Sequence, residues 1–379
     1  MLNDKNKHAF CPAHWDDIHY APSQGYLYGC CKATPIPIED VNELDQRKQN
    51  ALDGVRNPSC NYCWKTEDAG NESLRHNKLR EWDGTSNCRK LTLVLGNLCN
   101  LQCTYCNEKY SSKWQTDKKR FGEIKMQYDT DIYYAGKTCV NKESQVYIDF
   151  YNKTKPKSLT VSGGEPLIGN VFKDILTECD LSQLQDISVS TNLNYTKRDT
   201  IDKLLEFKDS HNITLNASLD TVDSNVQEYL RFGFNMDRFK SNLYDLLDNT
   251  PVRINFITLV TAQSVKGIYN LCKFVYHLKT VYPNRVNWYA STCVTPATHT
   301  FDILTETERA QALDEARKVQ QEIQDQLELI NINKVIATLE NAKYNEELRN
   351  DQSNFFKQFN ERQDIQTPQE LGFLIDANR

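Results

Sequence analysis

The sequence predicts an α/β fold in which six strand–helix units form a partial (β/α)6 barrel. Short β-rich runs alternate with helical stretches between residues 88 and 300. This alternation is typical of parallel β-α-β units with right-handed crossovers. A cysteine-rich segment, residues 1–80, precedes the barrel and holds five of the chain's 13 cysteines. The pattern after residue 301 is wholly helical, which predicts a helical C-terminal region, residues 301–379.

Six segments carry the strand pattern. In the first of them, Leu91, Leu93 and Leu95 alternate along the chain, as expected of a strand with one buried face. The carboxyl ends of parallel strands meet at one edge of a barrel, and TIM-like barrels carry their functional groups there. The predicted strands are residues 90–96, 158–166, 187–192, 213–220, 252–260 and 285–291.

Two further segments have a predicted role in the architecture. The stretch 107–157 is long and polar for a single connection, and we expect a helix plus an insertion that covers a site. In the C-terminal region, Thr305 and Glu308 form a capping-box signature for a helix. The apolar residues that follow mark one helical face, expected to pack in the core. They are Ala312, Ala316, Val319, Ile323, Leu327 and Ile330.

Composition narrows the classes of protein. Hydrophobic residues make up 39% of the chain and charged residues 25%, which is typical of a globular protein. The net charge of −6 argues against general binding to nucleic acid. No apolar run is long enough for a membrane span, and the first residues do not resemble a secretory signal. We therefore expect a cytoplasmic protein, in which clustered cysteines bind metal more readily than they form disulfides.

The three cysteines Cys99, Cys103 and Cys106 follow the first predicted strand immediately. Thiolates bind zinc or iron–sulfur clusters, and a structural site normally closes with four protein ligands. No fourth cysteine or histidine stands near Cys106 in the sequence. A cluster held by three cysteines keeps one iron open for a substrate or cofactor, so this loop predicts a catalytic metal site.

This loop, with Tyr105 just before its last cysteine, resembles the signature of radical S-adenosylmethionine (SAM) enzymes. The resemblance implies a [4Fe–4S] cluster whose open iron binds the amino and carboxylate groups of SAM. It implies reductive cleavage of SAM to a 5′-deoxyadenosyl radical, which abstracts a hydrogen atom from a substrate. In such enzymes the cofactor carries the chemistry while the protein positions and shields it. It also makes Tyr105 a candidate for the cofactor site, and no catalytic side chain is identified.

The second predicted strand ends in "SGGEP", which is similar to the Gly-Gly-Glu motif of the same family. Gly163 and Gly164 let a ligand approach the backbone closely. The Glu165 carboxylate accepts hydrogen bonds from an ammonium group. By the resemblance, these three residues bind the amino group of SAM.

Two weaker correspondences lie further along the chain. Thr191 and Asn192 end the third strand where relatives often carry Thr-Asn-Gly, and here Leu193 replaces the glycine. Ser218 ends the fourth strand, and Arg231 follows it. In related enzymes a serine and an arginine of this region contact the carboxylate or ribose of SAM, and arginine offers paired donors to a carboxylate. A strand-end turn and a surface ion pair are the structural alternatives for Ser218 and Arg231.

The N-terminal cysteines form a second group. Cys60 and Cys63 make a chelating Cys-x2-Cys pair, which Cys11 and Cys30 or Cys31 complete to four ligands. The segment resembles the twitch/SPASM class of auxiliary-cluster domains, in which a Gly-x4-Cys hairpin favours Cys30 as the ligand. The resemblance implies a second, closed [4Fe–4S] cluster, and a structural zinc site is the alternative.

The remaining residues of these types receive simpler predictions. His14 and His76 are candidate metal ligands, but we expect both histidines to lie on the polar surface. The scattered cysteines are expected to be small buried residues or bystanders. They are Cys88, Cys139, Cys179, Cys272 and Cys293.

Together these predictions divide the chain into an auxiliary-cluster domain at 1–80, a radical SAM core at 88–300 with the 107–157 insertion, and the helical region 301–379. They imply a radical SAM enzyme that receives electrons from a reductant such as flavodoxin or ferredoxin. Its expected substrate is a peptide or protein, with a nucleoside, sugar or small metabolite as the alternative. The competing hypothesis is a non-enzymatic, zinc-binding interaction protein. Substrate, electron donor and oligomeric state do not follow from the sequence.

Overall fold

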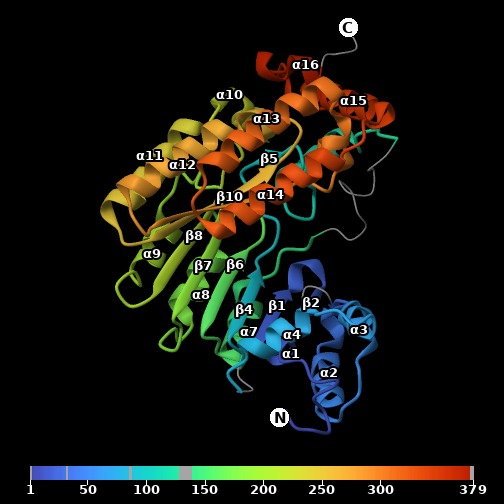
Figure 1. The fold of residues 1–379 in the computed structure, drawn as a ribbon. Helices are drawn as coiled ribbons and strands as arrows, with labels where there is room; N and C mark the ends of the chain where they lie inside the picture. Colours follow the sequence, from blue (N-terminus) through green and yellow to red (C-terminus); the bar gives the residue numbers. More distant parts are fainter. Residues whose placement is uncertain (1, 31–32, 85–87, 128–138, 376–379) are drawn as a thin grey trace. The chain divides into compact units, whose positions relative to one another are not determined.

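A computed structural model describes residues 2–30, 33–84, 88–127 and 139–375 (Figure 1). The chain divides into two compact units, each described by itself below. Unit 1 contains residues 1–96, 139–189 and 199–213. Unit 2 contains residues 97–138, 190–198 and 214–379. Cys31, the alternative to Cys30 as a ligand, lies outside the described residues.

The centre of unit 1 is a sheet of parallel strands. Strand β4 (Lys90–Val94) pairs with β6 (Ser158–Ser162), and β6 pairs with β7 (Asp186–Thr191). Leu93 lies opposite Val161 in this register, and both are fully buried. Alternate residues of each strand are buried, because successive side chains of a strand point to opposite faces.

The cysteine-rich N-terminal segment extends this sheet. Strand β1 (Asp17–Ala21) pairs in parallel with β4, which is therefore not an edge strand (Figure 1). Strand β2 (Tyr26–Tyr28) returns antiparallel to β1, and β3 (Ile36–Pro37) pairs antiparallel with β2. The turn between β1 and β2 ends at Gly25, whose φ of 81° suits glycine. The hairpin expected before Cys30 is confirmed, whereas no pattern in the sequence indicated that its strands join the parallel sheet.

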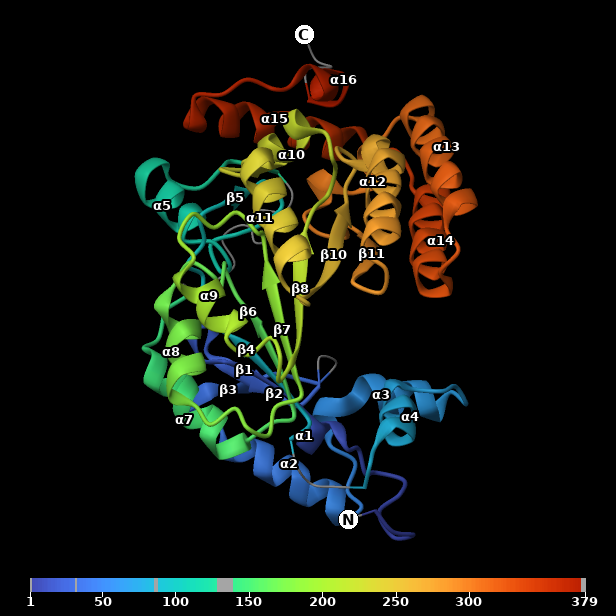
Figure 2. The same cartoon turned by 90° about the vertical axis from the view of Figure 1, so that its left-hand side faces the viewer.

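Two groups of helices belong to unit 1. The first lies within the cysteine-rich segment and comprises α1 (Ala13–Asp16), α2 (Asn42–Leu52), α3 (Asn61–Asp68) and α4 (Leu74–Glu81). The second group packs on the sheet in sequence order, α7 against α8 and α8 against α9 (Figure 2). These helices bury large side chains such as Tyr147 and Phe172. They are α7 (Ser144–Thr154), α8 (Asn170–Glu178) and α9 (Asp199–Leu205).

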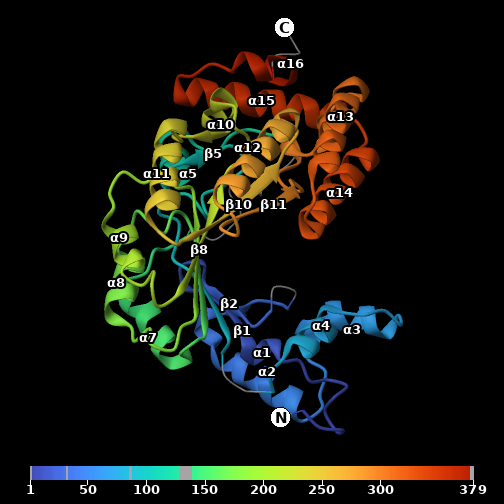
Figure 3. The same cartoon turned by 60° about the vertical axis from the view of Figure 1, so that its left-hand side comes forward.

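Unit 2 holds the second set of parallel strands. Strand β10 (Arg253–Val260) pairs with β8 (Asn212–Ser218) on one side and with β11 (Val286–Thr292) on the other. Helix α12 (Ile268–Val281) packs on β11 (Figure 3). A separate ladder joins two very short strands, β5 (Gln102–Cys103) and β9 (Arg231–Phe232). The other helices of this part are α5 (Ser112–Phe121), α10 (Ser224–Leu230) and α11 (Met236–Asn249).

The C-terminal region is helical, as expected. It contains α13 (Glu306–Glu322), α14 (Gln326–Asn341), α15 (Glu346–Gln363) and the short α16 (Gly372–Ile375). The predicted capping box of Thr305 and Glu308 is present at the start of α13. Helices α13 and α14 lie side by side, and α14 packs on β11 (Figure 3).

One prediction for this region is wrong. The expected apolar face runs through Val319 to Ile323, but helix α13 ends at Glu322. A new helix begins at Gln326, so the helical period is interrupted. Leu327 and Ile330 are consequently 73% and 48% exposed rather than buried.

The expected fold class is confirmed, because all six predicted strands are present. In unit 1, parallel pairing joins β1 to β4, β4 to β6 and β6 to β7. In unit 2, it joins β8 to β10 and β10 to β11. This arrangement is consistent with a partial TIM-like barrel.

Four of the scattered cysteines are buried and Cys179 is half-buried. Among the described residues, none of the helices has the length and apolar character required to cross a bilayer. Single 3-10 turns occur at Pro22–Gln24, Ile38–Asp40, Pro58–Cys60, Val265–Gly267, Ala297–His299, Phe301–Ile303 and Gln369–Leu371.

Gly163, just after β6, is fixed by the packing of the sheet. Its φ is 137°, and a Cβ there would lie 2.8 Å from the carbonyl oxygen of Gly96 and 3.1 Å from the nitrogen of Leu95. The neighbouring amide of Gly164 donates to the same Gly96 oxygen over 2.9 Å. A glycine is therefore required at position 163 because two strand ends approach closely there. This requirement adds to the access for a ligand that the sequence predicted.

We expect Gly163→Ala to lower the free energy of unfolding by about 2–4 kcal/mol, because a strained φ and a backbone clash add together. Gly70→Ala is the matched control, because Gly70 has a φ of 80° and a Cβ there would meet nothing within 4 Å. The control should lose only about 1 kcal/mol. Denaturant titrations of both variants measure the difference, and equal losses would show that the contact with Gly96 costs nothing.

Candidate functional site

The three-cysteine loop lies in unit 2 and is held on one side by the β5–β9 ladder. Cys103 lies opposite Arg231 in this ladder. Just beyond it, the amide of Thr104 donates to the carbonyl of Leu230 over 2.8 Å. The middle cysteine is thus fixed by main-chain pairing to a segment that follows it by more than 120 residues in the chain.

On its other side the loop is tied to the start of helix α5. The Ser111 hydroxyl donates to the carbonyl of Leu101 over 2.7 Å, and the amide of Ser112 donates to the carbonyl of Asn97 over 2.7 Å. The buried Trp114 indole donates to the carbonyl of Cys103 over 2.9 Å. These three backbone carbonyls therefore have hydrogen-bond donors, which a buried loop requires.

Helix α15 of the C-terminal region packs on this arrangement. Its Phe355 and Phe359 rings lie 6.3 and 5.9 Å from the ring of Trp114. Near the end of α15, Arg362 forms a 2.7 Å ion pair with the buried carboxylate of Asp117 in α5. The C-terminal helices, for which the sequence predicted no role, therefore support the cysteine loop through α5.

The chemistry of the donor set fits a metal cluster. The loop cysteines form no disulfide. Burial raises the pKa of Cys103 to about 11 and that of Cys106 to about 12, and the proximity of Cys103 adds to the rise at Cys106. The amide of Leu101 already points at the Cys99 sulfur over 3.4 Å. Thiolates here need a cation to be stable, which an iron–sulfur cluster provides.

Arg231 forms a buried ion pair beside this loop. Its Nε and Nη2 donate to the two carboxylate oxygens of Asp220 over 2.9 and 3.1 Å. The Tyr105 hydroxyl donates to the same carboxylate, and the Arg231 guanidinium lies 5.5 Å from the centre of the Tyr105 ring. Burial disfavours the charge of Arg231, but Asp220 outweighs it and raises the pKa. Of the two structural alternatives, the surface ion pair is therefore wrong, and the pair is internal.

Asp220 and His299 are two residues of this site that sequence reasoning missed. Asp220 also accepts the amide of Leu259 over 3.0 Å, so it joins two strand ends to the loop. The sequence carried one sign of this role, because an aspartate directly follows Ser218 and Leu219 at the end of the fourth predicted strand. His299 is buried between the rings of Tyr105 and Phe356, and its Nε2 lies 3.0 Å from the Thr104 hydroxyl. Burial lowers its pKa to about 3, and no motif announced it.

The Thr191–Asn192 turn also reaches the loop. The side-chain amide of Asn192 donates to the Asn100 side chain over 2.8 Å, and the Thr191 hydroxyl accepts from the amide of Leu193. Leu193 has a φ of 52° and is fully buried. It therefore adopts the left-handed conformation that a glycine would favour, and burial of its side chain offsets the strain. Ser218 is half-buried at the end of β8.

The Gly-Gly-Glu segment belongs to unit 1 and is described within that unit. Glu165 is buried, and one of its carboxylate oxygens accepts the amide of Leu167 over 3.1 Å. This bond fixes the side chain at the start of the turn. The cysteine loop, Thr191, Asn192, Ser218 and Arg231 belong to unit 2.

A second candidate site is a cavity in unit 1 that the four N-terminal cysteines line together. Cys11 and Cys30 come from two separate segments and Cys60 and Cys63 from one helical segment, and Trp64 also lines the cavity. Burial, chiefly, raises the pKa of Cys11 to about 12, and the other three thiols raise it further. None of the four is in a disulfide. Four thiols that line one cavity fit a bound cationic centre, because metal binding stabilises their thiolates.

His14 also lines this cavity, and its predicted place on the polar surface is wrong. Helix α1 carries it into the interior, where it is only 2% exposed. Its Nε2 lies 3.7 Å from the Cys60 sulfur, while its Nδ1 is buried without a hydrogen-bond partner. Burial, and then the charges of Arg47 and Lys48, lower its pKa to about 4. Periodicity could not reveal this, because α1 has only four residues.

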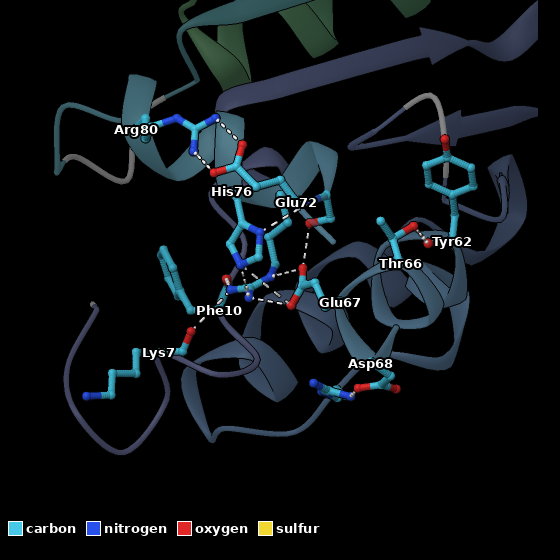
Figure 4. Close-up of polar contacts among 12 residues, drawn as sticks. Lys7, Phe10, Tyr62, Thr66, Glu67, Asp68, Glu72, His76 and Arg80 are labelled. Carbon is cyan, nitrogen blue, oxygen red and sulfur yellow. Dashed lines mark hydrogen bonds and ion pairs between the residues drawn. The ribbon is translucent and has the colours of Figure 1, made fainter. Parts of the chain in front are cut away.

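Arg75 braces the walls of the cavity. Its guanidinium donates to both carboxylate oxygens of Glu67 over 2.9 and 2.6 Å and to the carbonyl of Phe10 over 3.0 Å (Figure 4). Glu67 follows Cys63 on helix α3, and Phe10 precedes Cys11, so one side chain joins two of the cysteine-bearing segments. Burial raises the pKa of Glu67, but the bonds from Arg75 and Ser73 outweigh it and lower the pKa overall. The stabilisation is therefore present at neutral pH and is lost as pH falls through that lowered pKa.

Neither site presents a preformed single-ion geometry. Across the part of the chain that the structure describes, no three or more His, Cys, Asp or Glu side chains are arranged so that they could hold a metal ion. The two groups of cysteines fit a metal cluster by the type, number and burial of their thiols.

Comparison with known proteins finds a family model that matches the part of the chain that holds the first site. Residues 93–275 match the model of the Radical SAM superfamily. Curated relatives include probable GTP 3′,8-cyclases of Methanococcus maripaludis and Methanocaldococcus jannaschii, 25% and 24% identical over 193 and 189 residues. These alignments cover 49% of this chain and 55% of each relative. The chain thus spans about half the length of the curated relatives it matches.

Further similarities are to another curated protein and to solved structures. A 7-carboxy-7-deazaguanine synthase of Clostridium acetobutylicum is 26% identical over 133 residues, covering 35% of this chain and 48% of the relative. Streptococcus suis SuiB bound to precursor peptide SuiA is 16% identical, with a TM-score of 0.41 and coverage of 78% of this chain and 65% of that one. The enzyme anSMEcpe with bound AdoMet is also 16% identical, with a TM-score of 0.40 and coverage of 59% and 58%.

We expect Asp220→Asn to destabilise the protein by about 3 kcal/mol, because it leaves the charge of Arg231 buried without a counter-charge. Since Arg231 lies opposite Cys103, the variant should also bind less iron. Asp245→Asn breaks the half-exposed pair with Arg198 and serves as the control, with a loss within about 1 kcal/mol. Unfolding free energies and iron content measure both effects, and equal behaviour of the two variants would contradict the role of the buried pair.

We expect Glu67→Gln to lower the free energy of unfolding by about 3 kcal/mol, because Arg75 and Glu67 are both buried. Helix α4, which carries Arg75, also carries Arg80, the partner of the residue changed in the matched control. Glu72→Gln breaks the exposed pair of Glu72 with Arg80 (Figure 4) and should leave stability unchanged. Thermal unfolding at pH 7 compares them, and the difference should shrink at low pH, where Glu67 becomes protonated in both states.

Proposed function

Because this chain belongs to the radical SAM superfamily, we propose that Cys99, Cys103 and Cys106 hold the [4Fe–4S] cluster of a radical SAM enzyme. The family uses such a cluster together with SAM, and membership decides for an enzyme over a non-enzymatic zinc-binding protein. The observation that carries the placement is the loop itself, in which three cysteines that form no disulfide stand on a backbone fixed by β9 and by α5. The matched residues 93–275 include all three cysteines.

When bound, the cluster supplies the electron that cleaves SAM reductively, and the resulting carbon radical takes a hydrogen atom from the substrate. The protein's residues position and shield these groups. The open iron follows from the number of thiols, since three cysteines leave one iron free. Glu165, with Gly163 and Gly164, is the proposed acceptor for the amino group of SAM.

The unit 2 residues serve the same cofactor in this proposal. Thr191 and Asn192 stand at a strand end that contacts the loop through Asn100, and Ser218 ends the next strand of unit 2. Tyr105 and Arg231 share the carboxylate of Asp220. We propose that Asp220 holds them in place beside Cys103, so that a planar aromatic ring and a guanidinium face the cofactor site.

The four-cysteine cavity is proposed to hold an auxiliary [4Fe–4S] cluster, with Cys11, Cys30, Cys60 and Cys63 as its ligands. Four thiolates close such a cluster, which suits electron transfer or structural support. The support for this proposal is that thiols from three separate segments of the chain line one cavity. A structural zinc ion remains the alternative occupant.

The substrate is proposed only as an organic molecule that loses a hydrogen atom. A peptide or protein was the prediction from the sequence, with nucleosides, sugars or small metabolites as the alternative, and both stay predictions. The curated relatives share about half of their length with this chain, so their named reactions are not transferred to it.

We expect Cys103→Ala to abolish the formation of 5′-deoxyadenosine from SAM under anaerobic, reducing conditions. The variant should keep the irons of the auxiliary cluster, about four per chain instead of roughly eight. Cys272→Ala is the control, because Cys272 is a buried cysteine of helix α12 that lies outside both sites. It should retain activity and full iron content. Activity in Cys103→Ala, or the loss of all iron from it, would refute the division into two clusters.

A further inference from the structure

His14 is the buried polar side chain of the four-cysteine cavity that the proposed chemistry leaves unexplained. Its ring is 2% exposed and lines the same cavity as the four thiols. Nε2 lies 3.7 Å from the Cys60 sulfur. Nδ1, on the other side of the ring, is buried and has no hydrogen-bond partner. A buried imidazole without a partner for one nitrogen is costly, so its position calls for a reason.

The surrounding backbone keeps the ring in this place. Gly29, the residue before Cys30, is buried, and a Cβ there would lie 2.9 Å from the His14 Cα and 3.4 Å from Nδ1. The chain that carries Cys30 therefore presses on the Nδ1 side of the imidazole. Nε2, on the opposite side of the ring, faces Cys60.

The other N–H donors that line the cavity are held elsewhere. The Trp64 indole donates to the carbonyl of Asn57 over 2.7 Å. Arg75 is bound to Glu67 and to backbone carbonyls, and Lys78 donates to Asp17 over 2.9 Å. Of Trp64, Arg75, Lys78 and His14, it is His14 that lies against a cysteine sulfur. The half-exposed hydroxyl of Ser59 lies 3.8 Å from that sulfur, where water competes with it.

We propose that His14 is a positioning and tuning residue that donates an Nε2–H hydrogen bond to the Cys60 thiolate of the auxiliary cluster. This inference rests on the proposed auxiliary cluster. A cluster-bound thiolate only accepts hydrogen bonds, so the contact requires the proton on Nε2. Hydrogen bonds to cluster sulfurs stabilise the more negative, reduced state and raise the reduction potential. His14 therefore sets the auxiliary cluster to accept an electron more readily than four cysteines alone would.

The test isolates the auxiliary cluster. In the full-length parent Cys99→Ala/Cys103→Ala/Cys106→Ala, all iron belongs to the four-cysteine cavity. In this background, His14→Phe removes the N–H and keeps a planar ring, while His14→Gln keeps an N–H donor. The exposed His8 provides the matched control, His8→Phe. Iron content, the unfolding midpoint and the reduction potential, followed by electron paramagnetic resonance, are measured for each protein.

The expected result is unchanged iron with a more negative potential in His14→Phe, partial recovery in His14→Gln and no shift in His8→Phe. An unshifted potential in a folded, iron-loaded His14→Phe variant overturns the inference while leaving the auxiliary cluster in place. Loss of iron from a folded His14→Phe variant also overturns it, because His14 would then be a ligand. A parent protein without iron removes the auxiliary cluster itself, and both proposals fall together.

A measurement on the unsubstituted His14 covers the case in which His14→Phe does not fold. The parent is prepared with 15N-labelled histidine, reduced, and studied by pulsed electron paramagnetic resonance. A hydrogen-bonded Nε2 gives a weak nitrogen coupling, together with an exchangeable proton near the cluster. A strong coupling, as for a nitrogen bonded to iron, or the absence of any histidine coupling overturns the inference.

Discussion

The buried ion pair between Arg231 and Asp220 is the constraint on which the candidate active site depends. A guanidinium inside the protein is tolerated only when a carboxylate meets it with both oxygens and further donors satisfy that carboxylate. Asp220 meets these demands through Arg231, the Tyr105 hydroxyl and the amide of Leu259. Arg231 lies opposite Cys103 in the short ladder. The ion pair that neutralises Arg231 therefore also helps to hold the middle cysteine in place.

The same physical theme governs the four-cysteine cavity. Its thiols are kept close together by a brace of Arg75 and Glu67, both of which are buried. Gathering thiols in a dry interior opposes their ionisation, as the raised pKa of Cys11 illustrates. Such a site gains stability when a cationic centre binds the thiolates, so binding and local folding are coupled. Helix α15 plays the comparable supporting part for the other loop, through Trp114.

Local patterns were read from the sequence where one short segment decides its own structure. The strands of the barrel, the hairpin ending at Gly25 and the capping box of α13 are of this kind. The apolar face beyond Ile323 was misread, because a three-residue break resets the helical period and its local sign, the helix-capping Asp325, was not recognised. The strand β1 escaped notice, because a five-residue strand gains its partner, β4, only in the folded sheet.

By itself, the sequence determined the chemistry available to this protein. The spacing of Cys99, Cys103 and Cys106 and the glycine-glycine-glutamate turn are local features, and they sufficed to indicate the family. Only the tertiary structure decided which distant side chains complete each site. His14 has no periodicity or motif of its own, and Asp220 was marked only by its place at the end of a strand. Their roles arise because folding buries them beside a thiol and a charge. Burial is a property of the whole fold, so the sequence around a residue does not reveal it.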